Sequence, residues 1–292
     1  MKVLVTGAGG FIGRNLVAHF STRHRVAAPA RNELDLLDTV TVRSYLERQR
    51  FDVVVHAAGA RSNRAVGVAP DMLGRNCRMF FNLARNPHAF GRMLFLSSGA
   101  VYDRSCVPPM VTEEQFDERV PGEDYGFSKY VCAQSIRPDG KVYELRLFGV
   151  FGPYEDWRVR FISNACCRAV WDLPVVIRQN VFFDYLDVAD LACVLERFFS
   201  GRFRYRHYNL TSGRRVDLKT LAAEVVEASG KQLEIVVRQE GLGSEYSAAN
   251  QRLMAEIPEF RFRERKESIA RLYAWYVERK AEIDPELLRF DE

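Results

Sequence analysis

Short apolar runs alternate with amphipathic stretches along the first half of the chain. The runs are rich in valine and leucine, as is typical of strands that are buried on both faces of a parallel sheet. We predict five strands, at 3–6, 25–28, 53–58, 93–97 and 142–147. Helical spacing between them predicts helices that end near residue 20, cover 39–49 and 69–85, and begin near 124. This alternation predicts an α/β fold with a doubly wound parallel sheet.

A glycine-rich loop, Gly7-Ala-Gly-Gly-Phe-Ile-Gly13, joins the first strand to the first helix. Gly7 permits a tight turn, Gly10 lets the backbone approach a pyrophosphate, and Gly13 lets helix and strand pack closely. The start of the helix adds unpaired N–H groups and the positive end of its dipole. The loop therefore predicts a dinucleotide site in a Rossmann-type domain, and a purely structural glycine turn is the alternative.

The second half of the chain has a different organisation. After about residue 150 the alternation becomes irregular, and prolines and glycines separate shorter elements. We assign residues 1–150 to a dinucleotide-binding Rossmann domain, with a return segment near 181–212. Residues 151–180 and 213–292 are assigned to a smaller mixed α/β domain that binds substrate.

The residue after the second strand bears on the choice of cofactor. Many dinucleotide sites have an acidic residue there that holds the ribose 2′-hydroxyl, but this chain has Arg31. A guanidinium can bind a 2′-phosphate through two hydrogen bonds, so we predict NADP(H) in preference to NAD(H), which stays possible. A surface position is the alternative for Arg31. Asp35 could accept a hydrogen bond from the adenine amino group, or serve a turn or helix cap.

Composition and charge exclude several classes of protein. The 292 residues are 47% hydrophobic and 27% charged, and a formal net charge of +4 is spread along the chain, which argues against a nucleic-acid partner. No apolar run reaches the roughly 18–20 residues that span a bilayer, and we find no signal peptide, so we expect a cytoplasmic protein without a membrane partner. The six cysteines form no Cys-x-x-Cys pair and no cluster with histidine, so no metal site is predicted.

A tyrosine and a lysine four residues apart are the strongest candidates for chemistry. Tyr125 and Lys129 lie in a predicted helix, where positions i and i+4 share one face. A free tyrosine titrates at about 10, so a tyrosine that transfers protons near neutral pH needs a cationic neighbour. This spacing is common by itself, but the glycine loop provides a cofactor for the pair to serve.

The chain resembles the extended short-chain dehydrogenases/reductases that act on nucleotide sugars. The 31–35 segment is most similar to the branch of GDP-fucose synthase and the deoxysugar 4-ketoreductases, which uses NADPH. The resembling motifs follow one another along essentially the whole chain: Thr-Gly-x-x-Gly-x-x-Gly at 6–13, Asp35-Leu36, His56-Ala-Ala58, Asn76, Leu96 to Tyr102, Tyr125-x-x-x-Lys129, Arg146 to Pro153, Asp184 to Asp190 and Tyr208 to Gly213.

The resemblance implies a role for each site residue. Tyr125 would be the catalytic acid/base, Lys129 would bind the nicotinamide ribose and lower the tyrosine pKa, and Ser98 rather than Ser97 would orient the sugar oxygen. The implied cofactor contacts are Gly7, Gly10, Phe11, Ile12, Gly13, Arg31, Asp35, Leu36, Ala57, Ala58, Gly59, Asn76 and Lys129. The implied substrate contacts are Ser98, Gly99, Tyr125, Gly149, Arg160 and Phe183. Relatives often dimerise through the helices near 69–85 and after 129, so the resemblance also implies a homodimer.

Departures from the family pattern narrow the chemistry. A 4,6-dehydratase carries an Asp-Glu pair where this chain has Gly99 and Ala100, so dehydration is not expected. The Cys and His used for carbon epimerisation in GDP-fucose synthase are replaced by Ala100 and Tyr154, which argues against 3,5-epimerisation. Gly149 replaces an asparagine, and Phe183 replaces an arginine that grips the diphosphate in many relatives. Four other arginines could take its place: Arg160, Arg168, Arg178 and Arg252.

The expected function is an NAD(P)-dependent nucleotide-sugar oxidoreductase. The remaining chemistry fits an NADPH-using 4-ketoreductase or a 4-epimerase that acts on an NDP-hexose or deoxyhexose for a surface polysaccharide. Two alternatives stay open. One is a non-catalytic dinucleotide-binding sensor or assembly protein, and the other is a reductase of a non-sugar carbonyl.

Overall fold

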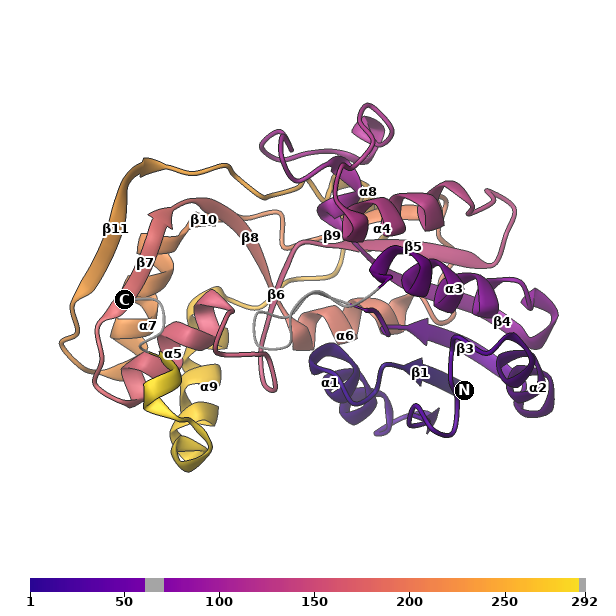
Figure 1. The fold of residues 1–292 in the computed structure, drawn as a ribbon, viewed down its shortest axis with the longest axis horizontal. Coiled ribbons are helices and arrows are strands. Elements are labelled where there is room, and N and C mark those ends of the chain that lie inside the picture. The colour runs from indigo at the N-terminus through magenta and orange to yellow at the C-terminus, as the bar shows by residue number, and fades with distance from the viewer. Residues whose placement is uncertain (61–70, 289–292) are drawn as a thin grey trace.

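The larger of two lobes is a parallel sheet with helices on both faces (Figure 1). The computed structural model describes residues 1–60 and 71–288. The sheet has six strands in the order β2-β1-β3-β4-β5-β9, and every neighbouring pair is parallel. The strands are β1 (Lys2–Thr6), β2 (Arg25–Ala27), β3 (Phe51–His56), β4 (Phe90–Ser98), β5 (Val142–Leu147) and β9 (His207–Leu210). This arrangement confirms the predicted fold class.

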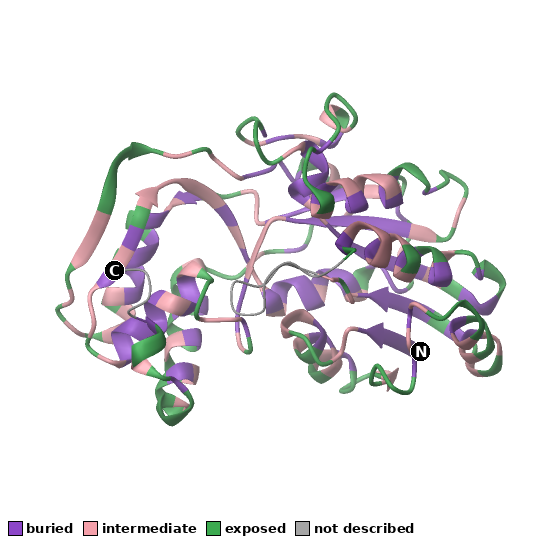
Figure 2. Ribbon diagram, viewed as in Figure 1, coloured by how far each residue is buried: buried purple, intermediate pink, exposed green. Residues whose placement is uncertain are grey.

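Two apolar cores lie on opposite faces of this sheet. The helices that cover it are α1 (Phe11–Phe20), α2 (Thr39–Gln49), α3 (Met72–Ala84), α4 (Asp124–Gln134) and α6 (Val188–Arg197). Val3 and Val5 join the core beneath α1 and α6, whereas Leu4 joins the core beneath α2, α3 and α4. Successive side chains of a strand face opposite sides, so each apolar run contributes to both cores. Figure 2 shows most residues of β1, β3, β4 and β5 as buried. Residues 69 and 70 of the predicted third helix lie outside the described residues.

The smaller lobe packs three helices against two short sheets. Its helices are α5 (Phe161–Val170), α7 (Leu218–Ser229) and α9 (Arg265–Glu278). One sheet has the order β10-β8-β6 and the other pairs β11 with β7. These strands are β6 (Gly149–Phe151), β7 (Val175–Asn180), β8 (Phe182–Asp187), β10 (Arg215–Asp217) and β11 (Ile235–Leu242). Short 3-10 helices complete the described chain: η1 (Pro87–Ala89), η2 (Gly99–Tyr102), η3 (Glu113–Gln115), η4 (Lys280–Glu282) and η5 (Pro285–Leu288).

One segment of the second half packs on the larger lobe. Helix α8 (Gln251–Glu256) and the residues that follow it place Leu253, Ile257 and Phe260 in the same core as β1 and β3. The sequence-based boundaries put this segment in the smaller domain. We propose instead that residues 251–260 belong to the larger one, because a domain is defined by a shared core.

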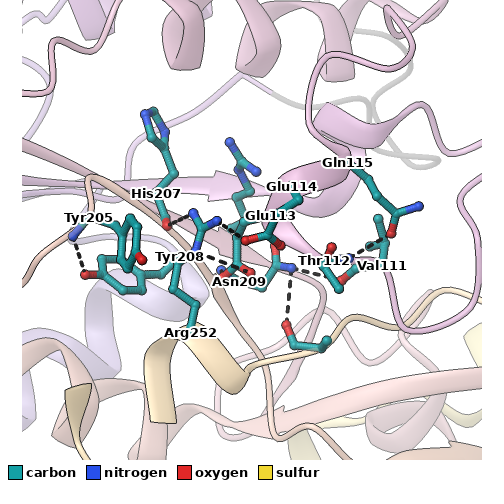
Figure 3. Close-up of polar contacts among 12 residues, drawn as sticks. Val111, Thr112, Glu113, Glu114, Gln115, Tyr205, His207, Tyr208, Asn209 and Arg252 are labelled. Atoms are coloured by element: carbon teal, nitrogen blue, oxygen red, sulfur yellow. Dashed lines mark hydrogen bonds and ion pairs between the residues drawn. The ribbon is translucent and has the colours of Figure 1, made fainter. Parts of the chain in front are cut away.

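Polar contacts anchor α8 beside the last strand of the sheet (Figure 3). Arg252 Nη1 donates to the carbonyl oxygen of His207 at 3.2 Å. The backbone N–H of Asn209 donates to Glu113 Oε1 at 2.7 Å, and its Nδ2 donates to the carbonyl oxygen of Ala249 at 3.2 Å. These bonds connect η3, β9 and α8, which are far apart in sequence.

Candidate active site

The glycine loop closes tightly between β1 and α1. Gly7 has φ +72°, and its carbonyl oxygen accepts from the N–H of Gly10 at 3.0 Å. A Cβ on Gly13 would lie 2.1 Å from the oxygen of Gly7, and a Cβ on Gly7 would lie 2.7 Å from Cα of Ala58. The helix therefore packs on the loop itself, and the loop packs on the end of β3. Neither position has room for a side chain.

A groove of about 1090 Å³ runs along this loop. Two features of the groove fit a dinucleotide. The space beside Gly9 is open, because a Cβ there would meet no atom within 4 Å, and the amino-terminal end of α1 lines the groove. Eleven predicted cofactor contacts line it: Gly7, Gly10, Phe11, Ile12, Gly13, Arg31, Asp35, Leu36, Ala57, Ala58 and Gly59. Residues that were not predicted also line it, among them Arg14, Arg75, Met79 and Tyr154.

The segment after β2 forms the outer end of the groove. Arg31 is exposed there and has no ion pair with the rest of the described chain. Asp35 Oδ1 accepts from the N–H of Leu37 at 3.1 Å, so this carboxylate has the turn role that was one of its two predicted uses. Glu33 Oε2 accepts from the N–H of Ala30 at 2.7 Å and stabilises the turn that presents Arg31.

Asn76 does not line the groove, but it stabilises Ala60, which does. Its Oδ1 accepts from the N–H of Ala60 at 2.7 Å, and its Nδ2 donates to the carbonyl oxygen of the same residue at 3.1 Å. Nδ2 also lies 3.3 Å from the hydroxyl of Ser128 on α4. Asn76 thus ties the connection after β3 to the helix that carries Tyr125.

The start of α4 is set by its own cap and by a close contact. Glu123 accepts from the N–H of Tyr125 at 3.0 Å and from that of Gly126 at 2.8 Å, which satisfies two donors at the helix start. A Cβ on Gly126 would lie 2.6 Å from the carbonyl oxygen of Ala100 in η2. The glycine lets α4 approach η2, whose N-cap residue is Ser98. This close contact holds the start of α4, which carries Tyr125, against the short helix that Ser98 begins.

Lys129 is buried beside Tyr125. Its Nζ donates to the carbonyl oxygen of Leu96 at 3.1 Å, lies 4.5 Å from the centre of the Phe95 ring and lies 5.7 Å from the centre of the Tyr125 ring. Burial, together with the charge of Lys129, lowers the pKa of His56 to about 3, so this histidine stays neutral. The ammonium charge acts within a low-dielectric site, where it favours an ionised phenol nearby.

A second pocket of about 230 Å³ meets the groove at Phe11 and Ile12, which line both cavities. The predicted residues in this pocket are Ser98, Tyr125, Gly149, Arg160 and Phe183. Ser97 lines it as well, although strand alternation places it on the other face of β4. The residues that sequence reasoning missed include Arg104, Glu123, Phe148, Glu155, Tyr185 and Tyr246. Phe148 and Tyr185 lie within the 146–153 and 184–190 motifs. Arg104, Glu123, Glu155 and Tyr246 lie in no motif, so no local signal could have identified those four.

The four arginines that could replace the one absent at position 183 lie in different places. Arg160 lines the pocket. Arg168 is buried and donates to Asn164 and to the carbonyl oxygens of Pro174 and Leu288. Arg252 pairs with Glu114, and Arg178 is exposed on β7 outside the pocket.

Aromatic groups fill the space above Gly99. A Cβ there would lie 2.5 Å from the Phe148 ring and 2.7 Å from the Tyr246 hydroxyl, so position 99 has no room for an acid/base side chain. Gly99 is buried and does not line the pocket. Tyr154 lies in the cofactor groove instead, beneath the guanidinium of Arg14 at 5.3 Å.

Two further features, a membrane-spanning helix and a metal-ligand cluster, are absent from the described residues. No helix within 1–60 and 71–288 has the length and apolar character needed to cross a membrane. In the same ranges, no three His, Cys, Asp or Glu side chains gather as metal ligands.

Comparison with known proteins gives a family match over most of the chain. A family model described as the NAD dependent epimerase/dehydratase family matches residues 3–210. GDP-L-colitose synthase of Yersinia pseudotuberculosis is 33% identical over 115 residues, which cover 36% of each chain. GDP-6-deoxy-D-mannose reductase of Pseudomonas aeruginosa is 26% identical over 259 residues, which cover 80% of this chain and 82% of the relative. The first match therefore spans about a third of that relative's length.

Solved structures share the fold along almost the whole chain. The structure of MlghC, a GDP-mannoheptose C4 reductase from Campylobacter jejuni with NADP bound, has a TM-score of 0.80. It covers 94% of this chain and 98% of its own, at 18% sequence identity. At that identity the likeness concerns the fold alone.

Proposed function

Because this chain belongs to the NAD dependent epimerase/dehydratase family, we propose that it is an NADPH-dependent 4-ketoreductase acting on a nucleotide sugar. Family membership confirms the resemblance and makes the chain an NAD(P)-dependent enzyme of the nucleotide-sugar epimerases and reductases. The proposal rests on one observation: Ser98 and Tyr125 line a single pocket that opens onto the cofactor groove. A role in making a surface polysaccharide, and a homodimer, are further proposals from the resemblance.

The proposed reaction needs one hydride and one proton. A bound nicotinamide would supply the hydride to the carbonyl carbon. The Tyr125 hydroxyl gives its proton to the carbonyl oxygen, and the Ser98 hydroxyl donates a hydrogen bond to that oxygen. The buried ammonium of Lys129 stabilises the phenolate left on Tyr125. The products are a secondary alcohol and the oxidised cofactor.

Two carboxylates in the pocket are engaged elsewhere, which supports a single proton-transfer group. Glu123 accepts from two backbone N–H groups at the start of α4. Glu155 is buried and accepts from the hydroxyl of Ser163 at 2.6 Å. Phe148 and Tyr246, which lie above Gly99 and line the pocket, also limit the space in which a 4-keto sugar would rotate. The crowding favours reduction over C4 epimerisation, whereas a single proton-transfer group is compatible with either reaction.

A panel of nucleotide sugars and their 4-keto forms tests the proposed function. We expect NADPH to be oxidised with a 4-keto nucleotide sugar, measured by absorbance, with an alcohol formed at C4, identified by NMR. Epimer formation without net NADPH oxidation would show a 4-epimerase instead. Silence on every nucleotide sugar would remove this substrate class.

Replacing Arg31 tests the cofactor preference. We expect Arg31→Ala to weaken NADPH binding roughly ten- to a hundredfold, because a charge-assisted hydrogen bond to the 2′-phosphate is lost. NADH lacks that phosphate, so its affinity should not change. Calorimetric titration of both cofactors measures the difference. Arg48→Ala, an exposed arginine outside the groove, is the control. An equal loss for both cofactors would mean that Arg31 does not read the 2′-phosphate.

A further inference from the structure

Arg75 presents an unpaired guanidinium to the cofactor groove. Its backbone N–H begins α3 by donating to the carbonyl oxygen of Asp71 at 2.9 Å, so the side chain projects from the first turn. The side chain is half-buried and lines the groove. Its Nε is buried and has no hydrogen-bond partner, and it forms no ion pair within the described ranges. A buried donor without a partner is costly, which points to a partner that arrives with a ligand.

Neighbouring contacts place Arg75 at the same part of the groove as the glycine loop. The next residue, Asn76, is bonded to both backbone groups of Ala60, so the start of α3 is held against the end of β3. That end touches the glycine loop, since a Cβ on Gly7 would lie 2.7 Å from Cα of Ala58. The loop and the first turn of α3 therefore both border the part of the groove at the end of β3.

The adenosine end of the groove lies further along the same helix. Met79 is one turn beyond Arg75 and also lines the groove. Asn82, near the end of α3, donates from Nδ2 to the carbonyl oxygen of Leu36 at 2.9 Å. The segment that carries Arg31 thus meets the far part of α3, and Arg75 lies nearer to the glycine loop.

We infer that Arg75 binds the pyrophosphate of the dinucleotide from the α3 side of the groove, an inference that rests on the proposed use of such a cofactor. The loop side contributes backbone N–H groups and the dipole of α1. A guanidinium adds a full charge and paired donors that match phosphate oxygens. The nearby Arg14 is already engaged, because its Nε donates to the carbonyl oxygen of Gly9 at 3.0 Å and its guanidinium lies over the Tyr154 ring.

Titration of the full-length protein with NADP⁺ and with NAD⁺ tests this inference by calorimetry. We expect Arg75→Met to weaken both ligands by the same factor, roughly ten- to a hundredfold, because the pyrophosphate is common to both. Arg75→Lys keeps the charge without the paired donors and should fall between. The matched control is Arg78→Met, which removes an exposed arginine from the same helix outside the groove and should leave both affinities unchanged.

The unfolding temperature without cofactor separates binding from a structural role. Arg75→Met should unfold at or above the wild-type temperature, because it removes an unpaired buried donor. A lower temperature with unchanged affinities would overturn the inference, as would a loss confined to NADP⁺, which would place Arg75 at the 2′-phosphate. If the wild type bound neither dinucleotide, the proposed function would fail with it. If the wild type bound both and Arg75→Met bound them equally well, only the inference would fail.

Discussion

Replacing Tyr125 with phenylalanine is expected to lower turnover roughly a hundred- to ten-thousandfold, the usual contribution of a positioned acid/base. Phenylalanine keeps the ring that lies 5.7 Å from the Lys129 ammonium and removes only the hydroxyl. Neither carboxyl group of the pocket is positioned to replace it, because Glu123 caps α4 and Glu155 bonds Ser163. Turnover of the best substrate from the panel, measured at saturating cofactor, gives the result.

Binding measurements separate lost chemistry from lost structure in this variant. NADPH affinity should stay within about twofold of wild type, because the catalytic group acts in the transition state. Tyr130→Phe is the matched control, since it removes a hydroxyl from the same helix that contacts Asp117 and Gln134 outside the pocket. Wild-type turnover by Tyr125→Phe would rule out this residue as the acid/base.

The second large effect is expected on folding stability, from a buried ion pair on β5. Arg146 Nε and Nη2 each lie 2.9 Å from Glu144 Oε2, and the two side chains are 1% and 0% exposed. His207 Nδ1 lies 2.8 Å from the same oxygen, and Arg146 Nη1 donates to the Tyr102 hydroxyl at 2.6 Å. Burial by itself would raise the pKa of Glu144, but the charge of Arg146 and the bond to His207 outweigh it and lower that pKa.

We expect Arg146→Met to lower the free energy of unfolding by about 3–5 kcal/mol, because it leaves the Glu144 carboxylate buried without its partner. Urea unfolding at pH 7 measures the loss. The double variant Glu144→Gln with Arg146→Met removes the buried charge as well and should recover much of the stability. Equal losses in the single and double variants would show that the two charges are not coupled.

Lowering the pH should reduce the difference in the free energy of unfolding between the wild type and the double variant. The folded-state pKa of Glu144 is lowered, so its stabilising contribution is complete above the unfolded value of about 4.3 and is lost as the pH falls through the folded value. Arg137→Met is the control, because its pair with Asp139 has side chains that are 78% and 72% exposed and should contribute little.

Most of the larger lobe could be predicted because its signals are local. Thr39–Gln49 forms the predicted helix with the predicted bounds, since its apolar spacing and its Asp38 cap lie within a few residues of each other. The glycine loop and the start of α4 could also be predicted, because their signals lie within a few residues of each other. The proposed place of residues 251–260 in the larger domain has no local signal, because these residues reach the larger core only through long-range packing.

Four features could be recognised from the amino-acid sequence alone: the alternation of strands and helices, the glycine loop, the Tyr125 and Lys129 spacing, and the order of motifs that identifies the family. These depend on backbone geometry and on residues close together in the chain. Packing between distant elements places Arg160 in the pocket, Arg75 in the lining of the groove and Tyr246 above Gly99. Tyr246 reaches that place because its N–H donates to the carbonyl oxygen of Phe182 at 2.9 Å, a contact between distant segments. Such contacts leave no local periodicity, because they arise only when separate elements pack together.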